Sequence, residues 1–381
     1  MSIGAALARA ATFLIVLLGL IACGSSPRQD PAPLQPVAES LGLGQAWQNS
    51  VGNRIEFSMQ TGTANQTLAA ATSRGTVVVM NATTGADLWR ARIDAELSSG
   101  VGFDGKTAAV TTIDNELVAF ALGSKNQPVI PWRRMLQARV YTAPLVAGGR
   151  VFVLAGDRTV QAFDAVTGAK LWNFQRASEP LILSQAGTLG VYQNTLLVGH
   201  SGRLLGINPD NGQVQWELSV ATSRATNDIE RLIDLVGVPN RVGDSVCVRS
   251  FQTSVACVDV AKNAVIWSKP SQGSTGVSGD AASMVSTESD GRVKVWNRAT
   301  GDLLWTSDKL VYRGLSTPLL VGNSIIVGDA EGYVHVMNKI TGAFTARFKT
   351  DGGAIVAAPV VLGNIVVVVT AKGGIYAYSP K

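Results

Sequence analysis

Residues 142–172 read TAPLVAGGRVFVLAGDRTVQAFDAVTGAKLW. Short apolar stretches alternate with Gly and Asp turns here, which is the pattern of consecutive antiparallel strands. This one stretch therefore predicts three or four short strands. Forty of the 381 residues are Gly, above the roughly 7% background and without the collagen period. We therefore predict that the whole chain is all-β, with many tight turns.

The most regular part of this stretch is a turn with Asn or Asp four residues before a Gly, and Trp four residues after it. The short polar side chain suits a turn, the Gly supplies a positive φ, and the Trp packs on a neighbouring sheet. In a weaker copy, Asn263 stands where the Gly belongs, before Trp267. The clear copies are Asn81, Gly85 and Trp89; Asp164, Gly168 and Trp172; Asn208, Gly212 and Trp216; and Asn297, Gly301 and Trp305.

The same strand position recurs about every 40 residues, the spacing of four-stranded propeller blades. We predict an eight-bladed β-propeller of four-stranded antiparallel blades. The last copy supplies only three strands, so the N-terminal strand around Trp47 is predicted to close the ring. The recurring position is held by Trp47, Trp89, Trp132, Trp172, Trp216, Trp267, Trp305 and Ala346.

The N-terminus carries an export signal: Arg9 followed by an apolar run to Ala22 that is too short for an ordinary transmembrane helix. Leu20-Ile21-Ala22-Cys23 at its end resembles the bacterial lipobox, in which the Cys is acylated after cleavage. The residues that follow are rich in Pro and predict an extended tether that holds the body clear of the membrane. The predicted domains are a signal peptide (1–22), lipidated Cys23 with its tether (23–40), and the propeller (41–381).

Composition narrows the functional classes. The formal net charge is only +5 and the basic residues are scattered, which argues against a nucleic-acid groove. Two His and three Cys cannot supply a multi-His metal centre. We expect no catalytic residue, no metal and no cofactor.

The Trp turn is similar to the docking repeat of quinoprotein (PQQ) dehydrogenases, which are eight-bladed propellers. Together with the lipobox and tether, the chain resembles the BamB family of outer-membrane assembly lipoproteins. Three stretches carry this narrower resemblance: Asp228–Asp234, Val327–Tyr333 and Leu315–Leu319.

The BamB resemblance implies a non-enzymatic scaffold of the outer-membrane β-barrel assembly (BAM) complex. Such a scaffold binds the POTRA domains of BamA, meets the other BAM lipoproteins through the complex, and helps nascent outer-membrane proteins fold and insert. It also implies a location on the periplasmic face of the outer membrane, held by a lipid anchor at Cys23.

The resemblance further implies which residues contact BamA. A Leu-x-Leu-Arg segment of the family corresponds here to Leu181, Leu183 and Ser184, so the Arg is absent. An Asp-x-Asp segment retains only Asp234. Either the partner has changed in step, or other charges, such as Glu230 and Arg231, contribute to the contact. Three consecutive apolar residues, 181–183, cannot all face one side of a sheet. At least one is therefore either exposed for a partner or buried on the other face of the sheet, so an inner-strand core segment is the alternative for these residues.

Two other functions are known for propellers of this kind or size. A PQQ-dependent dehydrogenase would need adjacent cysteines, a calcium site of acidic and Asn ligands, and an Asp base, and the sequence shows no such set. A ligand-binding propeller would need exposed aromatics in its channel, for which Tyr141, Tyr192 and Tyr312 are the candidates.

Two predictions depend on hairpin geometry. Sister copies carry Asp157 and Asp329 near the position of His200, so we expect His200 in a solvated turn. A hairpin turn centred on Gln252 would place Cys247 opposite Cys257, whereas a two-residue turn would put them on opposite faces. We predict no disulfide between them.

Overall fold

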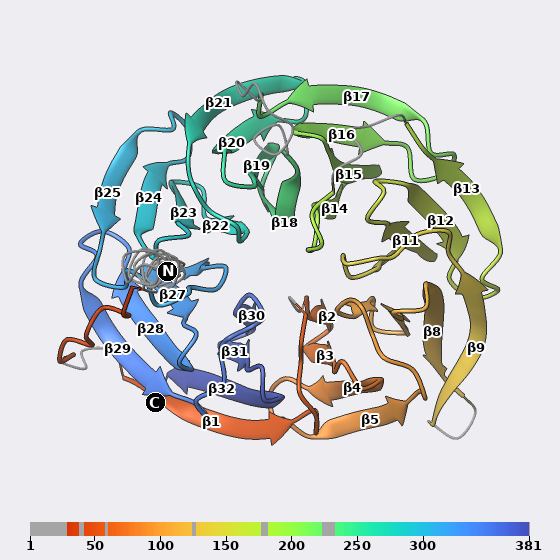
Figure 1. Ribbon diagram of the computed structural model, residues 1–381, viewed down its shortest axis with the longest axis horizontal. Helices are drawn as coiled ribbons and strands as arrows, with labels where there is room; N and C mark the ends of the chain where they lie inside the picture. The colour runs from red at the N-terminus through yellow and green to blue at the C-terminus, as the bar shows by residue number, and fades with distance from the viewer. Residues whose placement is uncertain are drawn as a thin grey trace, which may run out of the picture.

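The computed structural model describes residues 29–37, 42–57, 60–123, 127–176, 182–222 and 233–380. It is a ring of eight four-stranded antiparallel sheets around a central channel (Figure 1). The predicted all-β, eight-bladed propeller is therefore confirmed. Within the described ranges, no helix is long and apolar enough to cross a membrane.

The blades follow one another along the chain, each running from its innermost to its outermost strand. Blade 1 contains β2 (Gly62–Ala64), β3 (Thr67–Ala71), β4 (Thr76–Asn81) and β5 (Asp87–Arg92). Blade 2 contains β6 (Gly102–Phe103), β7 (Thr107–Thr111), β8 (Glu116–Leu122) and β9 (Pro128–Met135). Blade 3 contains β10 (Leu145–Ala147), β11 (Arg150–Leu154), β12 (Val160–Asp164) and β13 (Lys170–Phe174). Blade 4 contains β14 (Leu189–Tyr192), β15 (Thr195–His200), β16 (Arg203–Ile207) and β17 (Val214–Ser219).

The second half of the ring has the same order. Blade 5 contains β18 (Leu235–Val242), β19 (Ser245–Ser250), β20 (Ser254–Asp259) and β21 (Ala264–Pro270). Blade 6 contains β22 (Val277–Gly279), β23 (Ser283–Thr287), β24 (Val293–Asn297) and β25 (Leu303–Ser307). Blade 7 contains β26 (Leu319–Val321), β27 (Ser324–Gly328), β28 (Tyr333–Asn338) and β29 (Phe344–Lys349). Blade 8 contains β30 (Val360–Leu362), β31 (Ile365–Val369), β32 (Gly374–Pro380) and β1 (Leu43–Ser50).

Blade 8 joins the two ends of the chain. Its strand order is β30, β31, β32 and then β1, and β1 pairs antiparallel with β32 from Leu43 opposite Pro380 to Ser50 opposite Gly374. The N-terminal strand therefore closes the ring, as predicted. Closure leaves no open blade edge at the seam.

The hydrophobic core lies between blades. Each of the eight clusters of buried apolar residues joins two adjacent sheets, such as Val79 of blade 1 with Val110 of blade 2. Second strands are therefore buried on both faces, and β23 and β31 are buried along their whole length. This explains why β31, which reads IVVVV, is a continuous apolar run rather than a strict alternation. In β23, which reads SMVST, small hydroxyl side chains are buried beside the apolar ones.

Five of the predicted tryptophans lock one blade to the next. The Trp132 indole N–H donates to the Ala165 carbonyl at 3.0 Å, across the junction of blades 2 and 3. Gly168, at φ +67°, lies on the face of this indole, and an added Cβ would approach the ring to 2.5 Å. The turn therefore needs Gly for two reasons, its φ and the space that the neighbouring Trp takes. Trp47, Trp172, Trp267 and Trp305 make the equivalent hydrogen bonds to the Ala82, Pro209, Arg298 and Lys339 carbonyls.

Trp216 and Trp89 are placed differently. Asn263 replaces the Gly in the turn that would receive Trp216, and the Trp216 indole lies instead over Gly206 of its own blade. The backbone of Asn263 adopts a positive φ, +50°, as the Gly of the other turns does. Unlike Gly, however, Asn263 has a Cβ at the position that the Trp216 indole would occupy. Trp89 is buried and stacks on Phe120 of blade 2, with ring centroids 6.1 Å apart.

Cys247 and Cys257 form a disulfide, so the prediction of no disulfide is wrong. The reason is the turn. Ser250 pairs with Ser254 and leaves a three-residue loop centred on Gln252, at φ +52°. This loop length places Cys247 directly opposite Cys257 on β19 and β20.

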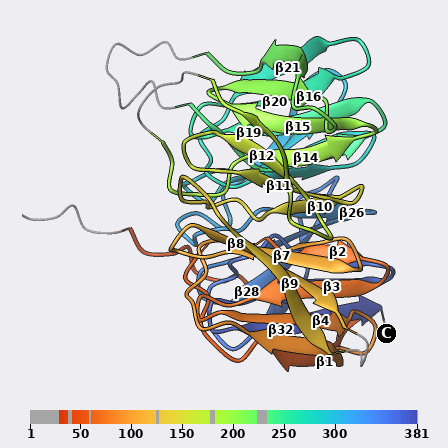
Figure 2. The same cartoon turned by 90° about the vertical axis from the view of Figure 1, so that its right-hand side faces the viewer.

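The two faces of the ring differ in the connections that they carry. Because the strands of a blade alternate in direction, the turns between second and third strands lie on the same face as the connections between blades. We call this face the hairpin face; residues 155–159 and 182–188 lie on it. Viewed edge-on (Figure 2), residues 29–37 lie on one side of the ring and the C-terminus on the other.

Candidate partner-binding site

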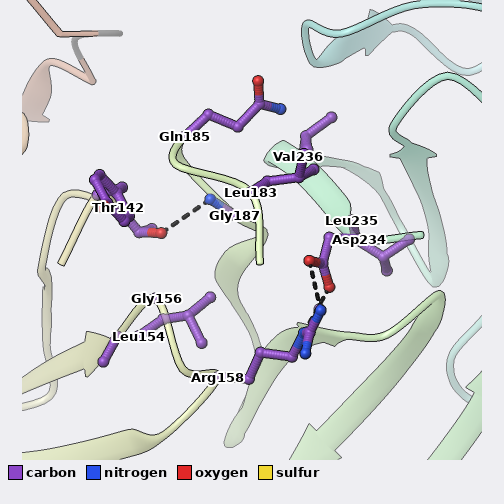
Figure 3. A pocket seen from close by; sticks show the side chains of 13 residues that line it. Thr142, Leu154, Gly156, Arg158, Leu183, Gln185, Gly187, Asp234, Leu235 and Val236 are labelled. Carbon is purple, nitrogen blue, oxygen red and sulfur yellow. Dashed lines mark hydrogen bonds and ion pairs between the residues drawn. The ribbon is translucent and has the colours of Figure 1, made fainter. Parts of the chain in front are cut away.

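An ion pair between two blades lies at the centre of the site. Arg158 Nε donates to Asp234 Oδ1 at 2.8 Å, and Arg158 Nη2 to Asp234 Oδ2 at 2.9 Å (Figure 3). Arg158 is in the β11–β12 hairpin at φ +65°, and Asp234 immediately precedes β18. Their side chains are 6% and 16% exposed. Bidentate geometry makes this pair strong and fixes the orientation of both groups.

Backbone pairing holds two interblade connections against each other beside this ion pair. The Thr188 N–H donates to the Leu235 carbonyl at 3.1 Å, and Gly187 forms an antiparallel bridge with Val236. The Gly187 N–H also donates to Thr142 Oγ1 at 2.9 Å. The chain that enters blade 4 is thereby fixed to the chain that enters blade 5, so the residues just before Gly187 are carried on a rigid base.

Apolar side chains surround the ion pair. Leu183 lines the same small pocket as Arg158 and Asp234. Ile182 is 39% exposed and approaches Gly156, beside the Tyr141 ring. Ile233 lies over Gly202 on the other side. Ile182 is exposed, whereas Leu183 and Ile233 are half-buried. Partly accessible apolar groups beside a largely buried charge pair resemble the arrangement of a protein-binding hot spot.

The structure brings together the predicted contact residues that it describes. Leu183 and Asp234 line one pocket, although 51 residues separate them in the sequence, and Ser184 is exposed beside them. Leu181, Glu230 and Arg231 lie outside the described residues. The sequence reasoning missed Arg158 and Ile233. Nothing near Arg158 in the chain marks it, because its partner is 76 residues away and two blades further round the ring.

His200 lies behind the site, and the prediction of a solvated turn is wrong. It is the last residue of β15, pairs with Arg203, and is 4% exposed. Its ring meets the Phe174 ring edge-on, with centroids 6.4 Å apart. Burial lowers the pKa of His200, and the nearby Arg158 charge lowers it further. The comparison with sister copies misled because Asp329 is itself fully buried.

The central channel offers a different environment. Its main cavity of about 540 Å³ is lined by inner-strand and connecting residues, and Glu56 is the one charged side chain among the described residues of this lining. Tyr141, Tyr192 and Tyr312 do not line this cavity, and the Tyr192 hydroxyl bonds Asp244. Among the described residues no three His, Cys, Asp or Glu gather as metal ligands. These residues do not fit a calcium-bound quinone, which needs several acidic and amide ligands.

The fold and the Trp-docked turns define the class: an eight-bladed propeller of the kind found in quinoprotein dehydrogenases, with a structured apolar and ionic site on its hairpin face. Among solved structures, the chain resembles BamB from Moraxella catarrhalis with a TM-score of 0.79 and 24% identity, over 88% of this chain and 99% of that one. Quinohemoprotein alcohol dehydrogenase from Comamonas testosteroni gives a TM-score of 0.66 and 13% identity, over 90% of this chain and 78% of that one.

Sequence comparison identifies the family. The family described as outer membrane protein assembly factor BamB matches residues 73–307 and 289–381. The BamB of Burkholderia pseudomallei is 34% identical over 96% of each chain. That of Bordetella pertussis is 35% identical, over 92% of this chain and 91% of that one. The chain belongs to the BamB family.

Proposed function

We propose that this chain is a non-enzymatic scaffold lipoprotein of the outer-membrane β-barrel assembly complex, anchored through Cys23 on the periplasmic face. It binds BamA through POTRA domains and so reaches the other BAM lipoproteins and nascent outer-membrane proteins. The BamB relatives of this chain, which are outer membrane protein assembly factors, support this role.

The Arg158–Asp234 site is the observation that carries the proposed contact. It combines a preorganised ion pair with exposed Ile182, half-buried Leu183 and the rigid backbone base at Gly187. Leu183 and its neighbour Leu181 would supply affinity. The charges, with Glu230 and Arg231, would set the orientation of the partner.

The absence of catalysis belongs to the same proposal. The described lining of the main channel cavity provides one carboxylate, Glu56, and the adjoining cavity adds Glu96; these two groups do not supply the base and the several ligands of the quinoprotein reaction. A rigid ring whose site is a surface, rather than a chemical constellation in the channel, suits a scaffold.

Calorimetric titration tests the proposal. The mature chain is titrated with the soluble POTRA array of BamA from the same organism. The double variant Leu181→Ala/Leu183→Ala should bind at least ten-fold more weakly, about 1.4 kcal/mol, with an unchanged thermal transition. Leu303→Ala/Leu304→Ala is the matched control, because these leucines are 49% and 53% exposed on the outer strand of blade 6. Equal affinity of both double variants would overturn the site; absence of binding by the unmodified chain would overturn the partner.

A further inference from the structure

Part of the Pro-rich N-terminal segment lies against the ring instead of extending freely. Residues 29–37, here called the strap, pass over blade 7 on the hairpin face (Figures 1 and 2). Ala32, Leu34 and Val37 are half-buried, while Pro31 and Pro33 are exposed. The apolar side chains of the strap therefore face the ring and its prolines face away.

Three hydrogen bonds hold the strap backbone. The Ala32 N–H donates to the Val311 carbonyl at 3.0 Å. Arg313 Nη1 donates to the Ala32 carbonyl at 2.9 Å, and Arg347 Nη1 to the Gln35 carbonyl at 2.7 Å. A Pro-rich segment has few N–H groups but keeps its carbonyls, so two arginine donors are well matched to it.

A buried network of side chains orients both arginines through contacts that do not involve the strap. Arg313 Nε donates to Asp329 Oδ2 at 2.7 Å, and the same carboxylate oxygen lies 3.0 Å from His335 Nε2. Arg347 Nε donates to His335 Nδ1 at 3.1 Å, so Nε2 carries the ring proton of the neutral His and donates it to Asp329. Arg313 also bonds Glu331.

The burial of this network shows that it is built into the blade. Asp329 and His335 are fully buried, and the Arg313 side chain is 3% exposed. The guanidinium of Arg313 lies over the Tyr333 ring and that of Arg347 over the Phe344 ring. Donors held this firmly bind an extended backbone without paying to order their own side chains.

We infer that the strap is a fixed clamp, and that Arg313 and Arg347 determine where the chain leaves the ring on its way to the lipid anchor. The inference about the anchor rests on the proposed acylation of Cys23. The chain from Cys23 to Ala32 has eight intervening residues and spans at most about 30 Å when fully extended, whereas a chain free up to Leu43 would span about 65–70 Å. The clamp halves the reach of the tether.

The clamp also decides which face of the ring turns to the membrane. The strap and the Arg158–Asp234 site lie on the same hairpin face, in blade 7 and in blades 3 to 5. A short tether that leaves the ring from the hairpin face keeps that face, and therefore the partner site, on the membrane side.

A distance measurement tests the clamp without any lipid. Nitroxide labels are placed at Gln35→Cys on the strap and Lys262→Cys on the ring of the mature chain, with Cys23 replaced by Ser. Lys262 has a side chain 79% exposed in the β20–β21 turn. We expect one narrow distance distribution, and at least a two-fold wider one in Arg347→Ala. Lys349→Ala, which removes an exposed cation from the same strand, is the control and should leave it narrow. A wide distribution in the parent chain, or equal widths in both variants, would overturn the clamp.

A second measurement tests its effect on orientation. The acylated chain on vesicles carries a fluorophore at Arg74→Cys on the hairpin face or at Lys262→Cys on the opposite face, with an acceptor on the lipid headgroups. Energy transfer should be higher from position 74, and Arg347→Ala should reduce that difference at least two-fold while Lys349→Ala preserves it. An unchanged difference in Arg347→Ala would show that the clamp does not orient the ring. Failure to bind vesicles at all would instead count against the proposed anchor.

Discussion

Two ion pairs on the hairpin face each join an interblade connection to a hairpin, but the acidic and basic residues have exchanged places between them. At the partner site, an interblade connection supplies the acid, Asp234, and a hairpin supplies Arg158. Under the strap, an interblade connection supplies Arg313 and a hairpin supplies the acid, Asp329. The side chains of the first pair are 6% and 16% exposed, and those of the second 3% and 0%.

This difference shows how one scaffold position serves two purposes. The blade 7 pair lies under the protein's own strap, which accepts hydrogen bonds from Arg313 of the pair and from the neighbouring Arg347. The other pair lies beside exposed Ile182 and half-buried Leu183, side chains suited to another protein. One pair therefore holds a segment of the chain itself, and the other is proposed to hold a partner.

The largest expected effect is at the buried pair. Asp329→Asn removes the buried carboxylate of Arg313 and leaves it only the half-exposed Glu331, which we expect to cost about 3–5 kcal/mol of unfolding free energy. Urea denaturation followed by tryptophan fluorescence measures this. Asp290→Asn, in the equivalent hairpin of blade 6 with a side chain 35% exposed, should cost less than about 1 kcal/mol. Similar losses for the two variants would remove the distinction between covered and open pairs.

The corresponding change at the partner site should be milder for stability and larger for binding. Asp234→Asn weakens a pair that solvent partly reaches, so we expect a loss of about 1–3 kcal/mol in unfolding free energy. Affinity for the POTRA array should fall at least ten-fold, while the strap distance distribution stays narrow. A variant that binds normally but releases the strap would contradict the division of roles.

The buried network should also give a pH signature. Burial, helped by the Arg347 and Arg313 charges and opposed by Asp329, lowers the pKa of His335. The unfolded chain, whose His titrates near pH 6.5, then binds more protons than the native chain as the pH falls. Unfolding free energy should be at its full value above about pH 6.5 and decline below it.

This signature is assigned by substitution. His335→Gln should give a shallower decline between pH 7 and pH 5 than the parent chain, whatever its absolute stability. His200, whose pKa is also lowered by burial, keeps part of the slope in that variant. If unfolding free energy falls equally steeply with decreasing pH in His335→Gln and in the parent chain, His335 does not contribute to the pH dependence of stability.

The smallest effect is expected at the edge of the network. Glu331 bonds Arg313 but its side chain is 50% exposed, so Glu331→Gln should cost less than about 1 kcal/mol, and less still at high salt. Denaturation at two salt concentrations checks this. A loss as large as that of Asp329→Asn would mean that Glu331, not Asp329, holds Arg313.

The fold could be predicted because its signal is local and repeated. Four of the turns carry both the Gly and the Trp within eight residues, and the same strand position recurs even where one of the two is missing. The spacing of Trp132, Trp172 and their equivalents therefore predicted the blade count and the closure. The one turn in which Asn263 replaces Gly is also the turn on which the preceding Trp, Trp216, does not pack; this Trp lies over Gly206 of its own blade.

Contacts between distant segments could not be predicted in the same way. The disulfide depends on whether the hairpin loop at Gln252 has two or three residues, and the sequence did not decide between these lengths. The loop has three, so Cys247 lies opposite Cys257. The Arg158–Asp234 pair and the strap contacts of Arg347 join segments 76 and 312 residues apart. The sequence predicted an extended tether for residues 23–40, which include the strap. Pro-rich composition indicates a stiff, extended chain, but it does not indicate whether that chain lies against the surface of the ring.

The most direct test of the central claim is photo-crosslinking in living cells. A benzoylphenylalanine at Ile182, 39% exposed in the candidate site, is compared with one at Ile340, 68% exposed in the β28–β29 turn on the opposite face. The account predicts a crosslink to BamA from position 182 and none from position 340. A BamA crosslink from position 340 alone, or equal crosslinks from both, would contradict it.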